Sequence, residues 1–143
     1  MLLLVKLSVK SDYAVRAVLS LARRHGAESV TRVEHLAEEN GIPASYLVQI
    51  LIDLKSGQIV KSLRGKEGGY MLARPPSEIT FAHVIRCIHG PLFDSPALSD
   101  PQCPPELKAV WVRLGQAVEL EASSINFQQL ADQSPMRGGS FDI

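Results

Sequence analysis

The segment from Thr31 to Arg74 constrains the fold of this 143-residue chain more than any other part of it. It holds two short amphipathic patterns of helical period, joined at Asn40-Gly41, and then two β-prone runs separated by a glycine-rich stretch. Gly41 can adopt a left-handed backbone conformation at no steric cost, which ends the first helix. The segment therefore predicts a helix, a tight turn, a second helix and a β-hairpin.

The two helices have recognisable starts. Thr31 and Glu34 stand three residues apart, as in a capping box, and predict that the first helix begins there. Pro43 suits the first turn of the second helix. Apolar residues recur in the second helix at spacings of three, four and seven, which predicts a buried stripe. They are Leu47, Ile50, Leu51 and Leu54.

The surface left by this packing suits DNA. Ser45, Tyr46 and Gln49 fall off the buried stripe, near the N-terminal end of the second helix, the part of a recognition helix that reaches base edges. The predicted strands Ile59-Val60 and Tyr70–Leu72 flank a narrow loop. This hairpin carries Lys61, Arg64 and Lys66. A basic loop of this kind suits phosphate contact or minor-groove insertion, so the segment predicts a winged helix-turn-helix.

The charge distribution agrees with this interpretation, although the net charge of the chain is zero. Residues 1–74 carry 11 Lys and Arg against 7 Asp and Glu, a charge of +4; residues 75–143 carry 4 against 8, a charge of −4. A basic half and an acidic half are consistent with one DNA-facing part and one part with another task.

Other classes of protein find little support. No apolar run approaches the length of a membrane span, and the apolar stretch 1–5 is too short for a signal peptide, so we expect a cytoplasmic protein. Two cysteines make no disulfide framework. Gly65–Gly69 lacks the spacing of a phosphate-binding loop, and no nucleophile–base pair or metal motif is present. We therefore expect no enzyme, no catalytic residues and no metal ligands.

Paired prolines after Arg74 break the chain and mark a domain junction. We predict a DNA-binding domain over residues 1–75, then a second unit over 76–133, and a frayed tail over 134–143. The second unit starts with a helix capped by Thr80, continues through a loop rich in Pro, Ser and Asp, and ends with a long helix and a short helix capped by Asn126 and Gln129.

The long helix is predicted over Glu106–Ile125 and carries an apolar seam with alternating spacings of four and three. The seam consists of Leu107, Trp111, Leu114, Val118 and Ile125. A long helix with such a seam commonly pairs with a second copy of itself, which predicts a homodimer. The alternative is that the helix packs only on its own chain. The predicted fold class is thus mostly α with a small β-wing, plus a long C-terminal dimerisation helix.

Placed in this order, the residues resemble the IscR/NsrR-type regulators of the Rrf family. The matching segments run from Lys6 to Leu92: KLSVKSDYAVRA, LAEENGIPASYLVQIL, IVKSLRGKEGGYMLARPP, EITFAHVIR and GPL. The resemblance implies a homodimer that controls transcription by binding an operator. The family positions that contact DNA match Ser45, Tyr46 and Gln49 in the recognition helix, and Arg64, Gly65 and Gly69 in the wing. Many members of this family have Glu at the position of Val48 and Pro-Gly at the position of Lys66-Glu67. These two differences affect which operator sequence we expect, but not the expectation that the chain binds DNA.

The loop before the long helix departs further from that family. Members that sense iron, nitric oxide or redox state hold an iron–sulfur cluster with three closely spaced cysteines in this loop. This chain has Cys103 alone there, with Ser95 and Ser99 near the other positions, so we expect no cluster. Two alternatives remain: a redox switch at Cys103, which stands just before a helix start, and a mixed metal site in which His83 and His89 join Cys103.

The sequence thus predicts a dimeric, sequence-specific DNA-binding transcriptional regulator, in the leading interpretation a repressor, without the iron–sulfur cluster. Its signal would be a small molecule, a partner protein or oxidation of Cys103. The alternative is a winged helix that binds another protein and has weak or no operator preference. A gel shift against DNA from the chain's own upstream region discriminates between the two.

Overall fold

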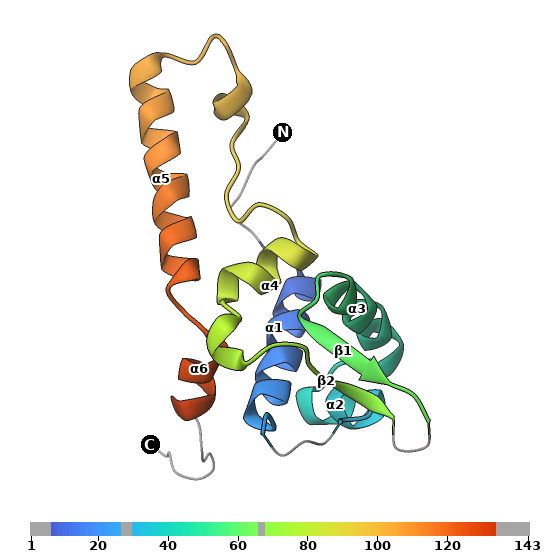
Figure 1. Cartoon of the computed structure of the whole chain (residues 1–143). Coiled ribbons are helices and arrows are strands. Elements are labelled where there is room, and N and C mark those ends of the chain that lie inside the picture. Colours follow the sequence, from blue (N-terminus) through green and yellow to red (C-terminus); the bar gives the residue numbers. More distant parts are fainter. Residues whose placement is uncertain (1–6, 27–29, 66–67, 134–143) are drawn as a thin grey trace, which may run out of the picture.

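The computed structural model describes residues 7–26, 30–65 and 68–133 (Figure 1). Those residues form six α-helices, two 3-10 helices and one two-stranded antiparallel sheet, which confirms the predicted fold class. In chain order the elements are α1 (Val9–Arg23), α2 (Val33–Asn40), α3 (Ala44–Ser56), β1 (Val60–Leu63), β2 (Gly69–Leu72), η1 (Pro76–Glu78), α4 (Phe81–Ile88), η2 (Pro96–Ser99), α5 (Pro105–Ser123) and α6 (Phe127–Gln133). None of the described helices is long and apolar enough to cross a membrane.

The main core lies among α1, α2 and α3, and α4 and α6 complete it by packing on α1. The predicted stripe of α3 is fully buried there, at Leu47, Ile50, Leu51 and Leu54, which confirms the helical pattern. Small buried residues on α1, Ala14 and Ala17, allow the neighbouring helices to approach closely. The core therefore draws side chains from both sides of the predicted boundary at residue 75.

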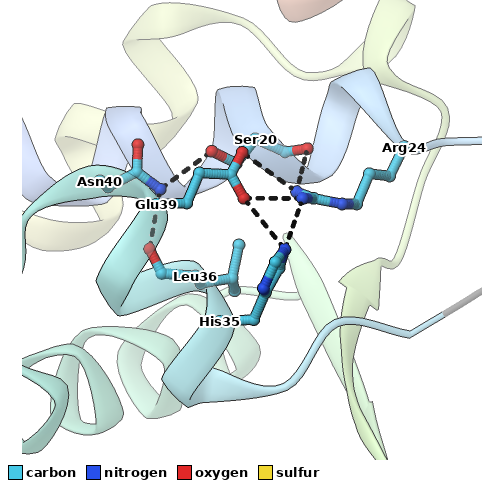
Figure 2. A network of polar contacts seen from close by, with 6 residues as sticks. All are labelled: Ser20, Arg24, His35, Leu36, Glu39 and Asn40. Carbon is cyan, nitrogen blue, oxygen red and sulfur yellow. Dashed lines mark hydrogen bonds and ion pairs between the residues drawn. The ribbon is translucent and has the colours of Figure 1, made fainter.

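Polar contacts fix α2 against the end of α1. Figure 2 shows Arg24 facing Glu39 and His35, with an Arg24–Glu39 ion pair of 2.7 Å and an Arg24–His35 hydrogen bond of 3.0 Å. Asn40 Nδ2 donates to the Oγ of buried Ser20 at 2.9 Å and to a backbone carbonyl of its own helix. These contacts hold α2, the first helix of the helix-turn-helix, against α1. The position of α2 in turn sets where the turn places the start of α3.

The predicted capping box at Thr31 and Glu34 is wrong. The helix starts one residue later, at Val33, with Arg32 as the N-cap residue and no side-chain cap. The backbone of Thr31 instead forms a bridge with Tyr70 on β2, through reciprocal hydrogen bonds of 2.9 and 2.8 Å. The N–H and C=O groups of Thr31 are thus hydrogen-bonded to the hairpin, in place of the predicted helix cap.

The wing consists of β1, β2 and the residues between them. The strands pair with Val60 opposite Leu72 and Leu63 opposite Gly69, so β1 begins one residue later and ends three residues later than the sequence predicted. Figure 1 shows the wing and α3 on the same side of the molecule, away from α5. The helix-turn-helix and the wing therefore present one shared face.

The segment after the wing leads through α4 and η2 to α5. Thr80 caps α4, as predicted. Its side chain accepts a hydrogen bond from His83 N, and Thr80 N donates to His83 Nδ1. The loop from Leu92 to Pro105 is not structureless, because η2 forms within it. Figure 1 shows α5 projecting from the rest of the structure, with its first residues farthest from the wing.

The C-terminal end of α5 returns to the core. The helix ends at Ser123, so Ile125 lies beyond it; the prediction that Ile125 belongs to the long helix is wrong. The carbonyl of Ile125 accepts a hydrogen bond from Phe81 N at 2.8 Å, next to a bridge between Thr80 and Asn126. Asn126 and Gln129 then cap α6 reciprocally, as predicted.

Candidate nucleic-acid interface

The predicted recognition residues lie exposed on the first two turns of α3. Ser45, Tyr46 and Gln49 are all exposed, while the neighbouring Leu47 and Ile50 are buried. The Tyr46 ring makes an edge contact with Tyr13 of α1, with 5.6 Å between ring centroids, which orients it. This arrangement leaves a hydroxyl, a phenol and an amide at the N-terminal end of a supported helix, the geometry by which such a helix reads a major groove.

A charge pair supports this face from behind. Asp53 lies one turn after Gln49 and accepts a hydrogen bond from its Nε2 at 3.3 Å. Lys10 Nζ on α1 donates to the other carboxylate oxygen of Asp53 at 2.7 Å. This bond from Lys10 is the main reason that the pKa of Asp53 is lowered. The only carboxylate of α3 is therefore held by a lysine, which limits its repulsion of DNA phosphates.

Two exposed apolar residues join this face, and neither was among the predicted site residues. Val48 and Ile52 stand four apart on α3 and both are exposed. Residues at this spacing lie on one side of a helix. Their methyl groups cannot accept a hydrogen bond from cytosine, but they suit the methyl group of thymine. The replacement of a frequent Glu by Val48 thus fits an apolar strip beside the polar recognition residues.

The wing brings basic side chains beside α3. Lys61 and Arg64 are exposed, and Gly65 turns the chain with a φ of 103°. Lys66 lies outside the described residues. Lys55 Nζ of α3 donates to Ser62 Oγ of β1 at 2.8 Å, a contact that joins the recognition helix to the wing. The sequence did not predict this role of Lys55, because it depends on the position of Ser62 in the folded structure.

Gly69 has a structural reason for being glycine. A Cβ at this position would lie 2.5 Å from the Thr31 carbonyl oxygen and 2.7 Å from its carbon. Those neighbours are backbone atoms, which cannot move aside as a side chain could. Gly69 therefore allows β2 to lie against the chain entering α2. This structural role is independent of the DNA contact predicted for Gly69.

The predicted dimerisation residues divide into two groups. Leu107, Trp111 and Leu114 are 54%, 37% and 47% exposed on the projecting part of α5. Val118 instead packs against a small cluster in its own chain, with Ala82 and Ala122. Ile125 is half-buried beyond the helix end. The exposed apolar face of α5 is therefore shorter than the predicted seam.

Contacts near that face hold α5 to the preceding loop. Phe93 lies 6.2 Å from Trp111 between ring centroids. Its ring also covers Gly115, where a Cβ would lie 3.1 Å from Phe93 Cδ2. Arg86 of α4 forms an ion pair with Glu119. These contacts join α5 to the α4 region.

The residues present do not fit the iron–sulfur cluster of the resembling family. Such a cluster takes four protein ligands, usually thiolates. Cys103 lies just before α5, but Ser95 is buried and its Oγ accepts from Ala97 N at 3.3 Å as the cap of η2. Cys87 Sγ donates to the Asp53 carbonyl at 3.3 Å, and burial, followed by the charge of Asp53, raises the pKa of the Cys87 thiol. Cys87 therefore packs between α4 and α3.

The mixed metal site predicted as an alternative is also not formed. His83 Nδ1 accepts from Thr80 N in the cap of α4, and His89 is the residue that ends this helix. Within residues 7–26, 30–65 and 68–133, no group of three or more His, Cys, Asp and Glu side chains is placed to hold a metal ion.

The fold and sequence match proteins of known class. A family model described as "Rrf2: Iron-dependent Transcriptional regulator" matches residues 7–133. The chain is 33% identical over 127 residues to the transcriptional regulator CymR of Bacillus subtilis, covering 89% of this chain and 90% of CymR. It is 48% identical over 88 residues to Rv1287 of Mycobacterium tuberculosis, named as an HTH-type transcriptional regulator, but this match spans only 54% of Rv1287.

Solved structures agree with these matches. The structure of CymR, titled the global cysteine regulator of B. subtilis, superposes with a TM-score of 0.81 over 94% of this chain and 99% of CymR. The structure of T. potens IscR, 32% identical, gives a TM-score of 0.74 over 94% and 93% of the two chains. The winged-helix architecture and the long C-terminal helix are thus shared with known regulators.

Proposed function

The chain belongs to the Rrf2 family, and on that premise we propose that it is a DNA-binding transcriptional regulator that acts as a homodimeric repressor. One observation supports the proposed mode of binding: α3 and the wing lie on the same side of the structure (Figure 1) and are joined by the Lys55–Ser62 bond, and the predicted contact residues of α3 and Arg64 of the wing are exposed. The helix would enter a major groove and the wing would follow the adjoining backbone. Bound there, the protein would obstruct transcription.

The proposed dimer forms through α5. Its projecting part exposes Leu107, Trp111 and Leu114 in a row, and burial of such a face against a second copy is favourable. A two-fold dimer requires an operator with approximate inverted symmetry, with half-sites about one helical turn or a multiple apart. Val118 and Ile125 would contribute only at the edge of this interface.

The proposed cellular role needs no catalysis. Relatives of this chain are transcriptional regulators, which are not enzymes. We place the protein in the cytoplasm, where its DNA target lies. Its signal would be a small molecule, a protein effector or oxidation of Cys103, since the ligand set of this chain does not suit an iron–sulfur cluster.

Arg64→Ala is expected to weaken operator binding by about 1–3 kcal/mol without unfolding the protein, because it removes one charged contact from an exposed loop. The measurement is a fluorescence anisotropy titration with an operator recovered by genome-wide selection of bound fragments. Arg113→Ala on α5 removes the same type of exposed side chain at a distance from the wing and serves as the control. Equal affinity of the Arg64 variant and the wild type at physiological salt contradicts the wing assignment.

Protein purified without oxygen is expected to bind its operator as an apoprotein and to contain no stoichiometric iron and sulfide, because one loop cysteine cannot supply the ligands of a cluster. Iron analysis, sulfide analysis and a visible spectrum make the measurement. Cys103→Ser is expected to leave the iron content unchanged. Stoichiometric iron with sulfide and visible absorbance, lost in Cys103→Ser, would overturn the prediction.

A further inference from the structure

An open surface hollow of about 510 Å³, called the cavity below, lies behind the recognition helix, where the end of α3, the chain leaving the wing and α4 meet. Its lining combines Asp53 and Gly57 at the end of α3 with Arg74 after β2 and His83 and Arg86 on α4. The volume falls within the range of ligand sites for small molecules. The cavity is far richer in nitrogen donors than the main core beside it.

Arg74 supplies a donor without an acceptor. Its Nε is buried and has no hydrogen-bond partner among the described residues. Arg74 also forms none of the ion pairs found within the described part of the chain. An arginine stays charged at all physiological pH values, and an unsatisfied buried donor of this kind destabilises the fold. An anion in the cavity would satisfy both the charge and the Nε–H.

His83 adds a second donor of fixed orientation. Its Nδ1 accepts the Thr80 backbone N–H at 3.1 Å, so the ring hydrogen of the neutral form is assigned to Nε2. Burial lowers the pKa of His83, and the positive charges of Arg74 and Arg86 lower it further. The ring is therefore neutral at pH 7 and offers an Nε2–H, and both arginine charges act on the same ring.

The carboxylates near the cavity are already occupied. Asp53 is held by Lys10 at 2.7 Å, and Glu119 pairs with Arg86 from α5. The charge of Arg74 is thus left without a carboxylate among the described residues. An incoming anion would meet Arg74 first, with His83 beside it, and would have no free acidic side chain to displace.

We infer that this cavity binds a small organic anion, whose carboxylate or phosphate group is held by Arg74 and by the Nε2–H of His83. A guanidinium matches either anionic group with two parallel hydrogen bonds, which accounts for an arginine at this position. Arg86 contributes positive charge at the rim while it remains paired with Glu119.

The position of the cavity gives the bound anion a route to DNA binding. The cavity touches the C-terminal turn of α3, whose other end carries the recognition residues, and Arg86 connects it to α5. A ligand that draws Arg74 and His83 together would favour one placement of the chain leaving the wing relative to α4, beside the end of α3. This regulatory consequence rests on the proposed function, whereas binding of the anion does not.

The test is a titration of the full-length, ¹⁵N-labelled protein without DNA, with inorganic phosphate in one arm and succinate in the other, at constant ionic strength. NMR signals of the Arg74 Nε–H and the His83 ring report on the cavity. Saturable shifts are expected with at least one of the two probes, and the probe that saturates at lower concentration identifies the anionic group. Shifts that stay linear with both probes would overturn the inference.

Matched variants make the assignment specific. Arg74→Gln is expected to weaken binding at least tenfold, and Arg74→Lys to weaken it less, because it keeps the charge but loses the planar pair of donors. Arg113→Gln removes an exposed arginine from α5 and is expected to change nothing. Equal binding by Arg74→Gln, with its fold confirmed by thermal melting, would refute the role of Arg74.

A second measurement separates this inference from the proposed function. Operator affinity is measured with and without the saturating probe, in wild type and in Arg74→Gln. A change in affinity that is lost in Arg74→Gln supports the regulatory route, and equal affinities refute it. Saturable anion binding by a protein that binds no operator would overturn the proposed function alone, and operator binding without anion binding would overturn only the inference.

Discussion

Trp111→Glu is expected to convert the proposed dimer to a monomer and to weaken operator binding about 100-fold or more. The substitution places a carboxylate in the exposed apolar face of α5, where a dimer would bury it without a partner. Two half-sites bound by one linked dimer gain a large factor in affinity over separate monomers, and that gain is lost on dissociation. Sedimentation velocity gives the oligomeric state and anisotropy gives the operator affinity.

Two further variants show whether the apolar face itself is responsible. Leu114→Glu introduces the same charge on that face without disturbing the Phe93–Trp111 contact, and we expect it also to be monomeric. Leu120→Glu adds the charge at a residue that is 74% exposed and lies on α5 beyond the Leu107–Leu114 row, so we expect a dimer. A dimer in both Trp111→Glu and Leu114→Glu would show that α5 is not the interface.

Phe127→Ala is expected to lower the free energy of unfolding by about 3–5 kcal/mol, the range for removal of a buried aromatic ring. The Phe127 side chain is only 1% exposed and lies in the main core, stacked on Phe81 with 6.3 Å between ring centroids. Its backbone N–H also donates to the Ile79 carbonyl at 3.0 Å, a bond that the substitution leaves in place. Urea denaturation followed by circular dichroism gives the free-energy difference.

Leu120→Ala is the control for Phe127→Ala, because it truncates an apolar side chain that is mostly exposed; the expected change is within about 0.5 kcal/mol. Phe127→Leu keeps most of the buried volume and is expected to fall between the two. A loss of less than 1 kcal/mol in Phe127→Ala would show that α6 does not hold the end of α5 to the core.

Local patterns predicted much of this fold. The buried stripe of α3 could be predicted from the helical period alone. The caps at Thr80 and Asn126 could be predicted from neighbouring residues in the sequence, because their partners lie three positions away. The cap at Thr31 failed for a physical reason: its backbone has a competing partner in Tyr70, 39 positions along the chain. A sequence pattern shows which bonds a segment can form locally, but not which distant strand will take them instead.

The candidate sites show the same division. The exposed recognition residues followed from the buried stripe, since α3 has only one other face to offer. The end of α5 did not, because Ile125 is drawn out of the helix by its bond to Phe81. The anion-binding cavity was also missed, since Arg74 and His83 belong to different elements and only folding brings both to the end of α3.

The bridge between Thr31 and Tyr70 has a consequence for engineering new operator specificity. It fastens the wing to the start of α2 through backbone atoms alone, while the Thr31 side chain is buried. A chimera that transplants only α2 and α3 would keep the bridge of the recipient but would join the donor's helices to the recipient's residue 31 and wing. An exchange between relatives should therefore carry the chain from residue 31 through Leu72 as one cassette, with Gly69 retained, and randomise only the exposed positions of α3.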